Sequence, residues 1–515
     1  MEKTKLKNKS LLNSIDIKFI LVFIFIIAVQ FWFVTYGTGN PFGKEGLTTS
    51  YDDLGVSLLK GTTTINESSI STERINIDGK IYMYFAPFPA IIRIIPNLLF
   101  SSLYGQWSRL SGLFASLICL LAFALLTKQQ LSQNKFLTNK QKDIFFYISF
   151  ISFGLGFPLI YLLSSCYLYH EAIIWGFCWS ICGVCTLISL LTNQNQHFLK
   201  VFAFSAFTGL AYISKVTFGF PLYLILAPVL ISIFSQYIYD RFKINFFRTF
   251  QLFEYSDQFK DIKTFALKFF ILACPALIAF SIYAWYNYDK YKSIFTYHDH
   301  KYDLAFQLNK DHLKNYNDRG GDLCYKRIPT ALSYYFGLRA DNFSTKAPFV
   351  HIYHVPWFIN RFYEYNEWII SQLIVSLWII VGGVLGIFYL TKCKRNKLIT
   401  ISCWALSTHF FIICSFWMIS QRYSTEFFPL FIFIYSFYLR EIGEEKYLGR
   451  LISVKLWILF CVIFSAVSVM SSILSSLHWG AVYNWAAPQE YKNKLIEAFS
   501  LIDYYIYNLR FILRH

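Results

Sequence analysis

Charged residues are scarce in this chain: they make up 15% of its 515 residues, whereas soluble globular proteins carry about a quarter. With 56% apolar residues as well, the chain is neither a solvated multidomain enzyme nor an intrinsically disordered protein. It also lacks glycine-rich nucleotide-binding fingerprints, and its two halves show no duplication of the kind found in many transporters. These absences favour a polytopic membrane protein, and the aromatic share of 20% fits it because Trp and Tyr collect at membrane interfaces.

Apolar runs long enough to cross a bilayer, about 20 residues each, are present in large number. They lie at roughly 19–36, 107–127, 144–163, 171–192, 201–214, 216–238, 265–286, 367–390, 398–418, 423–439 and 456–476. The pair around Lys215 requires this side chain to reach an interface or a cavity. Residues 86–104 contain three prolines and Arg93, so they predict an interfacial or re-entrant element. The predicted fold is an all-α bundle of about eleven transmembrane helices.

The basic residues orient this bundle. The segments predicted inside hold 23 of the 47 Lys and Arg, and the short segments predicted outside hold 6. The positive-inside rule therefore places the N-terminus in the cytoplasm and residues 477–515 outside. The net charge of +17 therefore reflects how the chain is oriented in the lipid bilayer. We expect no nucleic-acid partner. The predicted units are a transmembrane module at 1–286 with its first outer loop at 37–106, a long outer loop at 287–366, further helices at 367–476 and the tail at 477–515.

Two adjacent carboxylates, Asp52 and Asp53, lie in the first outer loop. A carboxylate that is partly desolvated at the mouth of an apolar cavity can act as a general base. The alternative is a solvated loop in which Asp52 caps a helix N-terminus.

Residues 77–96 combine Lys80, Tyr82 and Tyr84 with a proline-rich apolar segment that carries Arg93. Cations beside an apolar groove suit a lipid phosphate, and aromatic side chains suit a sugar or the first isoprene units. Snorkelling of the two cations to lipid headgroups is the alternative.

Polar residues also mark three later outer positions. His170 and Glu171 open the fourth span; the helix dipole alone favours this Glu, but it could also bind a divalent metal ion or orient an acceptor hydroxyl. Arg422 and Tyr423 lie in a tight outer turn where a guanidinium suits an anionic headgroup. His298 and His300 flank Asp299; on a strand they would point to opposite faces, so His298 is a weak metal candidate.

In this order, these motifs resemble the GT-C superfamily of integral-membrane glycosyltransferases, which take sugars from polyprenyl-phosphate donors. The resemblance is greatest to the bacterial proteins related to protein mannosyltransferases and to aminoarabinose transferases of lipid A. The matching positions are Tyr51-Asp52-Asp53-Leu54, Leu58-Leu59-x-Gly61, Asp78-Gly79-Lys80-x-Tyr82-x-Tyr84-Phe85-x-Pro87-x-Pro89-Ala90 with Arg93 and Pro96, Tyr169-x-Glu171-Ala172 with Trp175-Gly176, Tyr286-Asn287-Tyr288, and Arg422-Tyr423 with Phe427-Phe428-Pro429. The chain departs from the pattern at Asp289-Lys290, where related chains often continue with Arg-Phe-Gly.

The resemblance implies an inverting glycosyltransferase of the plasma membrane with an extracytoplasmic active site. It implies Asp52 or Asp53 as the base, phosphate ligands among Lys80, Arg93 and Arg422, and a second acidic position at Glu171 that some members use with a divalent metal ion. The partners would be a polyprenyl-phosphate sugar and an extracytoplasmic acceptor. A transporter of a lipid-linked saccharide is the alternative function, and a non-catalytic scaffold is the third.

Overall fold

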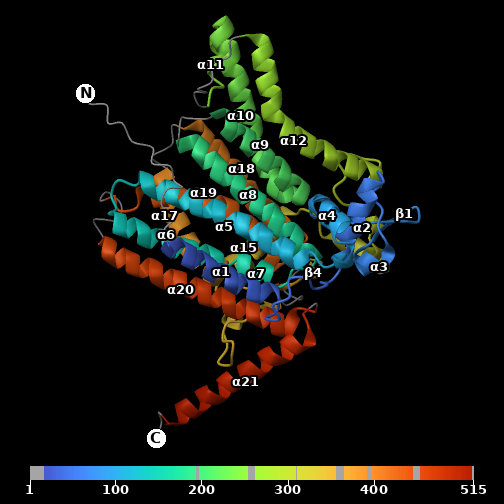
Figure 1. The fold of residues 1–515 in the computed structure, drawn as a ribbon, viewed down its shortest axis with the longest axis vertical. Coiled ribbons are helices and arrows are strands. Elements are labelled where there is room, and N and C mark those ends of the chain that lie inside the picture. Colours follow the sequence, from blue (N-terminus) through green and yellow to red (C-terminus); the bar gives the residue numbers. More distant parts are fainter. Residues whose placement is uncertain are drawn as a thin grey trace.

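The structure is a computed structural model that describes residues 17–192, 197–252, 261–308, 310–354, 363, 365–390, 396–444, 453–485 and 487–512. Parts of the predicted inner segments 1–18, 193–200, 239–264, 391–397 and 440–455 lie outside the described residues. Helices dominate the described chain (Figure 1).

Nine stretches of the described chain are helical, apolar and long enough to cross a membrane. They are α1 (Ile17–Val34), α5 (Ser108–Gln133), α6 (Asn139–Leu155) with α7 (Leu159–Leu163), α8 (Leu168–Thr192), α9 (His197–Ser214), α10 (Val216–Phe242), α12 (Ile262–Tyr291), α18 (Lys397–Ser415), and α20 (Val454–His478) with the π-turn η10 (Trp479–Tyr483). The prediction of an all-α polytopic membrane protein is confirmed. The other two predicted spans contain helices of 14 residues, α17 (Leu377–Leu390) and α19 (Phe428–Glu441), so the number eleven stays a prediction.

The segment between α1 and α5 folds into short elements at one end of the bundle (Figure 1). They are α2 (Thr49–Leu59), α3 (Glu67–Ile70), η1 (Ser71–Glu73), the antiparallel strands β1 (Ile75–Ile77) and β2 (Lys80–Tyr82), α4 (Phe88–Leu99) and η2 (Ser101–Leu103). Helix α4 has 12 residues, too few to cross a bilayer. Its Ile95, Leu98 and Leu99 are exposed while Arg93 is buried, as expected of the predicted interfacial element.

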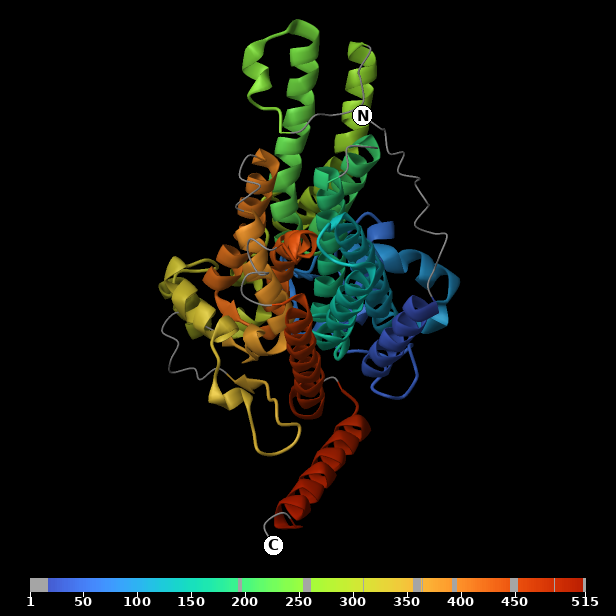
Figure 2. The ribbon, with the colours of Figure 1, turned by 90° about the vertical axis from the view of Figure 1, so that its left-hand side faces the viewer.

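The segment after α12 is longer and also made of short elements. It contains η3 (His300–Tyr302), α13 (Leu304–Leu308), α14 (Lys310–Asp318), η4 (Tyr325–Arg327), α15 (Ile328–Phe336), η5 (Ala340–Asn342), β3 (Tyr353–His354), β4 (Tyr365–Asn366), β5 (Trp368–Ile369) and α16 (Gln372–Val375). β3 pairs with β5, and β4 pairs in parallel with β6 (Met418–Ile419), which leads into the 3₁₀ helix η8 (Gln421–Phe427). Figure 2 shows this segment in yellow beside the helices. The remaining helices are α11 (Asn245–Arg248) and α21 (Gln489–Ile512), which extends away from the bundle.

Local sequence sets several of the helix ends. Thr138 and Gln141 form a reciprocal capping box at the start of α6, and the Asp261 side chain accepts a bond from the Thr264 amide at the start of α12. Such caps satisfy amides that have no partner within the helix. Lys215 has an extended backbone and separates α9 from α10.

Helix α8 is the centre of the bundle. It packs against α5, α9 and α19, and most of its residues are buried. Its first turn carries Glu171 at the same end of the bundle as α2 and α4. The fold thus brings the acidic residue of α8 to the segment that carries Asp52.

Candidate functional site

The close approach of α2 to α4 places Asp52 beside Arg93. A Cβ atom on Gly55 would lie 3.1 Å from the carbonyl oxygen of Ala90, so glycine allows the two helices to lie this close. Asp52 lies in the first turn of α2, and residue Thr48 is the N-cap. The alternative that Asp52 is a solvated helix cap is wrong, because its side chain is buried and faces α4.

Arg93 binds two carboxylates at once. Its Nη1 donates to Asp52 Oδ2 at 2.6 Å, and its Nη2 donates to Glu171 Oε2. It also donates to the Thr48 carbonyl at 2.9 Å and to Ser108 Oγ at 2.5 Å. Asp52 and Glu171 are each 0% exposed and Arg93 is 1% exposed. We call these three residues the Asp52 cluster; it carries a formal charge of −1 when both acids are ionised.

Both aspartates of the first outer loop have further partners. Asn97 Nδ2 donates to Asp52 Oδ1 at 2.6 Å. The Tyr104 hydroxyl donates to Asp53 Oδ1, and the Asn66 amide donates to Asp53 Oδ2 at 3.3 Å. A carboxylate offers about four acceptor positions. Each aspartate therefore keeps acceptor capacity, and the geometry leaves both as candidate bases.

Arg422 forms a second buried cluster on η8. Its Nη1 donates to Glu367 Oε2 at 2.6 Å, and its guanidinium carbon lies 4.4 Å from the ring centre of Tyr169 and 5.2 Å from that of Tyr423. Its Nε has no hydrogen-bond partner within the described part of the chain. We call Arg422, Glu367, Tyr169 and Tyr423 the Arg422 cluster. It combines a cation, which suits a phosphate, with aromatic rings, which suit an apolar chain attached to that phosphate.

Tyr84 and Glu73 adjoin the Arg422 cluster. The Tyr84 hydroxyl lies 3.4 Å from Glu73 Oε2. Burial raises the pKa of Glu73, although Tyr169 and Arg422 oppose this shift. Tyr84 thus lies near Arg422, and its predicted contact with a substrate stays a prediction.

The first turn of α8 joins the two clusters. The Tyr51 hydroxyl donates to the Leu168 carbonyl at 3.3 Å, the Tyr169 ring lies under Arg422, and Glu171 binds Arg93. His170 turns away to the Ser165 carbonyl and contacts the rings of two tyrosines. Residues far apart in the sequence thereby share one end of the bundle.

Lys80 and Tyr82 lie apart from the two clusters on β2. The Lys80 side chain is exposed, and none of the side-chain hydrogen bonds or ion pairs found in the described ranges involves it. Tyr82 is 4% exposed. Their predicted contacts with a donor stay predictions.

Several charged residues of this region were not among the site residues that the sequence predicted. Lys290, at the end of α12, is 2% exposed, lies 3.4 Å from the Met83 carbonyl and is 3.9 Å from the ring centre of Tyr286. Lys215 pairs with buried Glu426 at 2.6 Å and lies 4.5 Å from the Tyr423 ring centre. An acidic residue within an apolar stretch is a signal that could have found Glu426. Glu367 is the first residue of the predicted run 367–390, and Lys290 follows the Tyr286-Asn287-Tyr288 motif; neither position by itself indicated a site residue.

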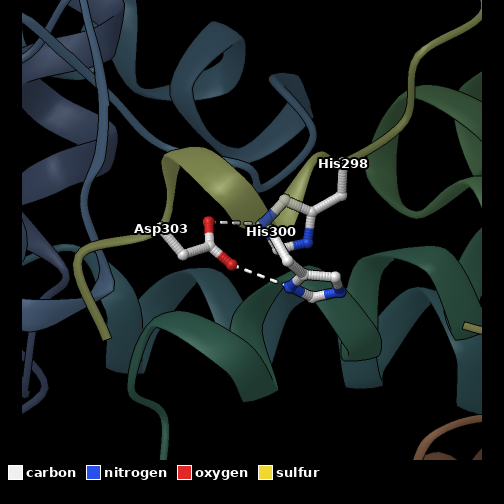
Figure 3. A group of neighbouring side chains, drawn as sticks. All are labelled: His298, His300 and Asp303. Atoms are coloured by element: carbon white, nitrogen blue, oxygen red, sulfur yellow. Dashed lines mark hydrogen bonds and ion pairs between the residues drawn. The ribbon is translucent and has the colours of Figure 1, made fainter. Parts of the chain in front are cut away.

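His298, His300 and Asp303 form a third group (Figure 3). The expectation that the two histidines point to opposite faces of a strand is wrong, because residues i and i+2 of a strand share a face and because the chain enters the turn η3 at His300. Both imidazoles instead face Asp303. One candidate ligand atom from each residue lies within 4.8 Å of the others, so the three could hold a metal ion. Glu171, the other metal candidate, binds Arg93.

No family model and no curated protein matches this chain. Among solved structures, it is similar to the oligosaccharyltransferase of Archaeoglobus fulgidus in complex with Zn and sulfate, with 12% identity, a TM-score of 0.44, and coverage of 92% of this chain and 56% of that chain. It is also similar to AglB, the oligosaccharyltransferase of the same organism, in complex with an inhibitory peptide and a dolichol-phosphate, with 13% identity, a TM-score of 0.42, and coverage of 93% and 59%. The chain spans just over half the length of these structures.

Proposed function

We propose that this protein is a membrane glycosyltransferase that moves a sugar from a polyprenyl-phosphate-linked donor to an extracytoplasmic acceptor. The observation that carries the proposal is the pair of buried clusters at one end of the bundle. One presents carboxylates beside an arginine, and the other presents an arginine among aromatic rings. The motifs that resemble the GT-C superfamily supply several residues of both clusters.

In the proposed reaction, Asp52 or Asp53 accepts the proton of an acceptor hydroxyl or amine. The acceptor oxygen or nitrogen attacks the anomeric carbon, the bond from that carbon to the phosphate oxygen breaks, and the configuration inverts. Arg93 would hold the Asp52 side chain in place through their ion pair at 2.6 Å. Arg93 would therefore position the acid, although the sequence also suggested it as a phosphate ligand.

The phosphate of the donor would bind at Arg422. A cation held in place before the reaction stabilises the charge that develops on a leaving phosphate. Glu367 fixes one side of the guanidinium at 2.6 Å, and Tyr169, Tyr423 and Tyr84 would face the sugar or the first isoprene units. Lys80, another cation that the sequence predicted for the phosphate, is exposed on β2 and has no part in this proposed phosphate site.

We propose the plasma membrane as the location, with the N-terminus in the cytoplasm. The module at 1–286 would supply the acids, and the loop at 287–366 with the tail at 477–515 would recognise the acceptor. The 367–476 unit would supply Arg422.

The test uses purified protein in liposomes with a panel of polyprenyl-phosphate sugars, and it measures release of polyprenyl phosphate. A general base contributes about 10²–10⁴-fold, so we expect Asp52→Asn or Asp53→Asn to lower the rate by at least about 100-fold. Asp78→Asn is the matched control because Asp78 is exposed in the same loop, and its rate should equal that of the unchanged protein.

Two results would contradict the proposal. Full activity in both single variants and in the double variant would exclude the aspartates as the base. Movement of intact donor across the membrane without cleavage would identify a transporter.

A further inference from the structure

We propose that His298, His300 and Asp303 bind a zinc ion that orders the long outer loop where it packs against the first outer loop. This inference is independent of the proposed sugar transfer. It concerns a site outside the two clusters described above.

The three side chains already converge on a small volume (Figure 3). His298 Nε2 lies 2.7 Å from Asp303 Oδ1, and His300 Nδ1 lies 2.8 Å from Asp303 Oδ2. Zinc bonds of about 2.0–2.1 Å in a tetrahedron place ligand atoms about 3.4 Å apart. The observed separations, none above 4.8 Å, bracket this value, so small side-chain movements would admit the ion.

The ligand set selects the metal. Two imidazoles with one carboxylate suit zinc or a similar transition metal, whereas calcium and magnesium prefer oxygen ligands alone. Three protein ligands leave a fourth position of the tetrahedron for water.

A further carboxylate, that of Asp322, contacts His300 on the side of the ring that faces away from Asp303. Asp322 Oδ1 lies 3.1 Å from His300 Nε2, the ring nitrogen that faces away from Asp303. Histidines that bind metals commonly donate their other ring N–H to a carboxylate, which fixes the orientation of the ring. His300 therefore has both the metal-facing nitrogen and the supporting partner of such a ligand.

Aromatic side chains pack around both histidines. His300 is 5% exposed, and its ring contacts Phe306, Tyr316 and Trp417. The ring of His298 stacks on Tyr84 at a centroid distance of 4.6 Å. An apolar shell of this kind holds ligands in place and limits access of water to the ion.

The site lies where two segments of the chain meet. Asp303 forms a β-bridge with Ile75, and the Leu304 amide donates to the Arg74 carbonyl at 3.1 Å. A metal ion bound here would fix the long loop against β1. His298 stacks on Tyr84, the Tyr84 hydroxyl lies near Glu73, and Glu73 interacts with Arg422. The ion would therefore also restrict movement of the residues around Arg422.

Metal analysis tests the proposal on the full chain, purified in detergent without a polyhistidine tag and grown with added zinc. We expect about one zinc per chain by mass spectrometry, and at most about a tenth of that in His298→Ala and His300→Ala. His312→Ala is the matched control: His312 lies in the same loop, its ring contacts Phe306, and its zinc content should stay at the original level. Asp322→Asn should keep the site but weaken zinc binding by about 10–100-fold.

A second measurement uses the unchanged protein and so avoids variants that fail to fold. Removal of metal with a chelator should lower the thermal midpoint and speed proteolysis within 287–366, and zinc chloride should reverse both. A preparation without zinc, or zinc retained in both histidine variants, would overturn the proposal. The first result would identify the group as a hydrogen-bonded network, and the second would place the ion elsewhere.

Discussion

Arg93 is the residue on which the buried acids depend. Burial penalises a charged side chain strongly unless an opposite charge and hydrogen bonds compensate. Asp52 and Glu171 are fully buried and both bind this one guanidinium. Their shared partner explains why a proline-containing apolar helix such as α4 carries an arginine on its inner side.

Replacement of Arg93 by methionine should destabilise the protein by about 3–5 kcal/mol, because it leaves two buried carboxylates without a cation. The thermal midpoint in detergent measures this effect. Lys80→Met is the control at an exposed position and should leave the midpoint unchanged. The triple variant Arg93→Met, Asp52→Asn, Glu171→Gln should recover part of the loss, and a triple variant as unstable as Arg93→Met alone would exclude the charge explanation.

At the scale of elements, the two short helices α17 and α19 pack unusually closely. A Cβ atom on Gly382 of α17 would lie 2.4 Å from the ring of Tyr435 on α19. That ring is buried, and its hydroxyl lies 2.7 Å from Ser149 Oγ of α6. The ring is therefore held from both sides and has little room to move.

Adjacent glycines allow a direct test of this contact. Gly382→Ala should destabilise the protein by about 1–3 kcal/mol, the usual effect of an overfilled core, and a lower thermal midpoint would show it. Gly383→Ala adds the same methyl group to the same helix where no atom lies within 4 Å, and its midpoint should not fall. Equal effects of the two substitutions would mean that helix propensity, and not the approach of Tyr435, decides the outcome.

At the scale of the whole molecule, the question is how often the chain crosses the membrane. Helix α19 is short, but η8 precedes it and lies against the first turn of α8 through Arg422 and Tyr169. At its other end, the Leu439 and Ile442 carbonyls accept bonds from Asn134, the residue after α5. The segment from η8 to the end of α19 thus runs between the two ends of the bundle, as a crossing segment would.

Reporter fusions distinguish eleven crossings from nine. With eleven, alkaline phosphatase fused after Ser420 should be active, because this position lies outside; with nine crossings it lies inside and the enzyme should be inactive. A fusion after Lys243 should be inactive in both cases, and a fusion at the C-terminus should be active in both. An active fusion after Lys243 would contradict the predicted orientation itself.

Much of the fold followed from the composition and the spacing of apolar residues. Helices appear at all eleven predicted runs, because a bilayer requires every backbone group of a spanning segment to be paired within it. The lengths of the helices at 367–390 and 423–439 were not predictable, since β5 and α16 occupy the largely apolar start of the first run, and the 3₁₀ helix η8 extends through the first five residues of the second. The turn at His300 was also missed, because a pair of histidines separated by one residue does not distinguish a strand from a 3₁₀ turn.

The sequence by itself determined that this is a helical membrane protein, and it identified acids and cations that apolar packing does not need. Only the tertiary structure decided their partners. Arg93 is held between Asp52 and Glu171, Arg422 is held by Glu367, and His298 and His300 face one aspartate. Hydropathy depends on residues that are neighbours along the chain, whereas these ion pairs join segments that only the three-dimensional arrangement of helices brings together.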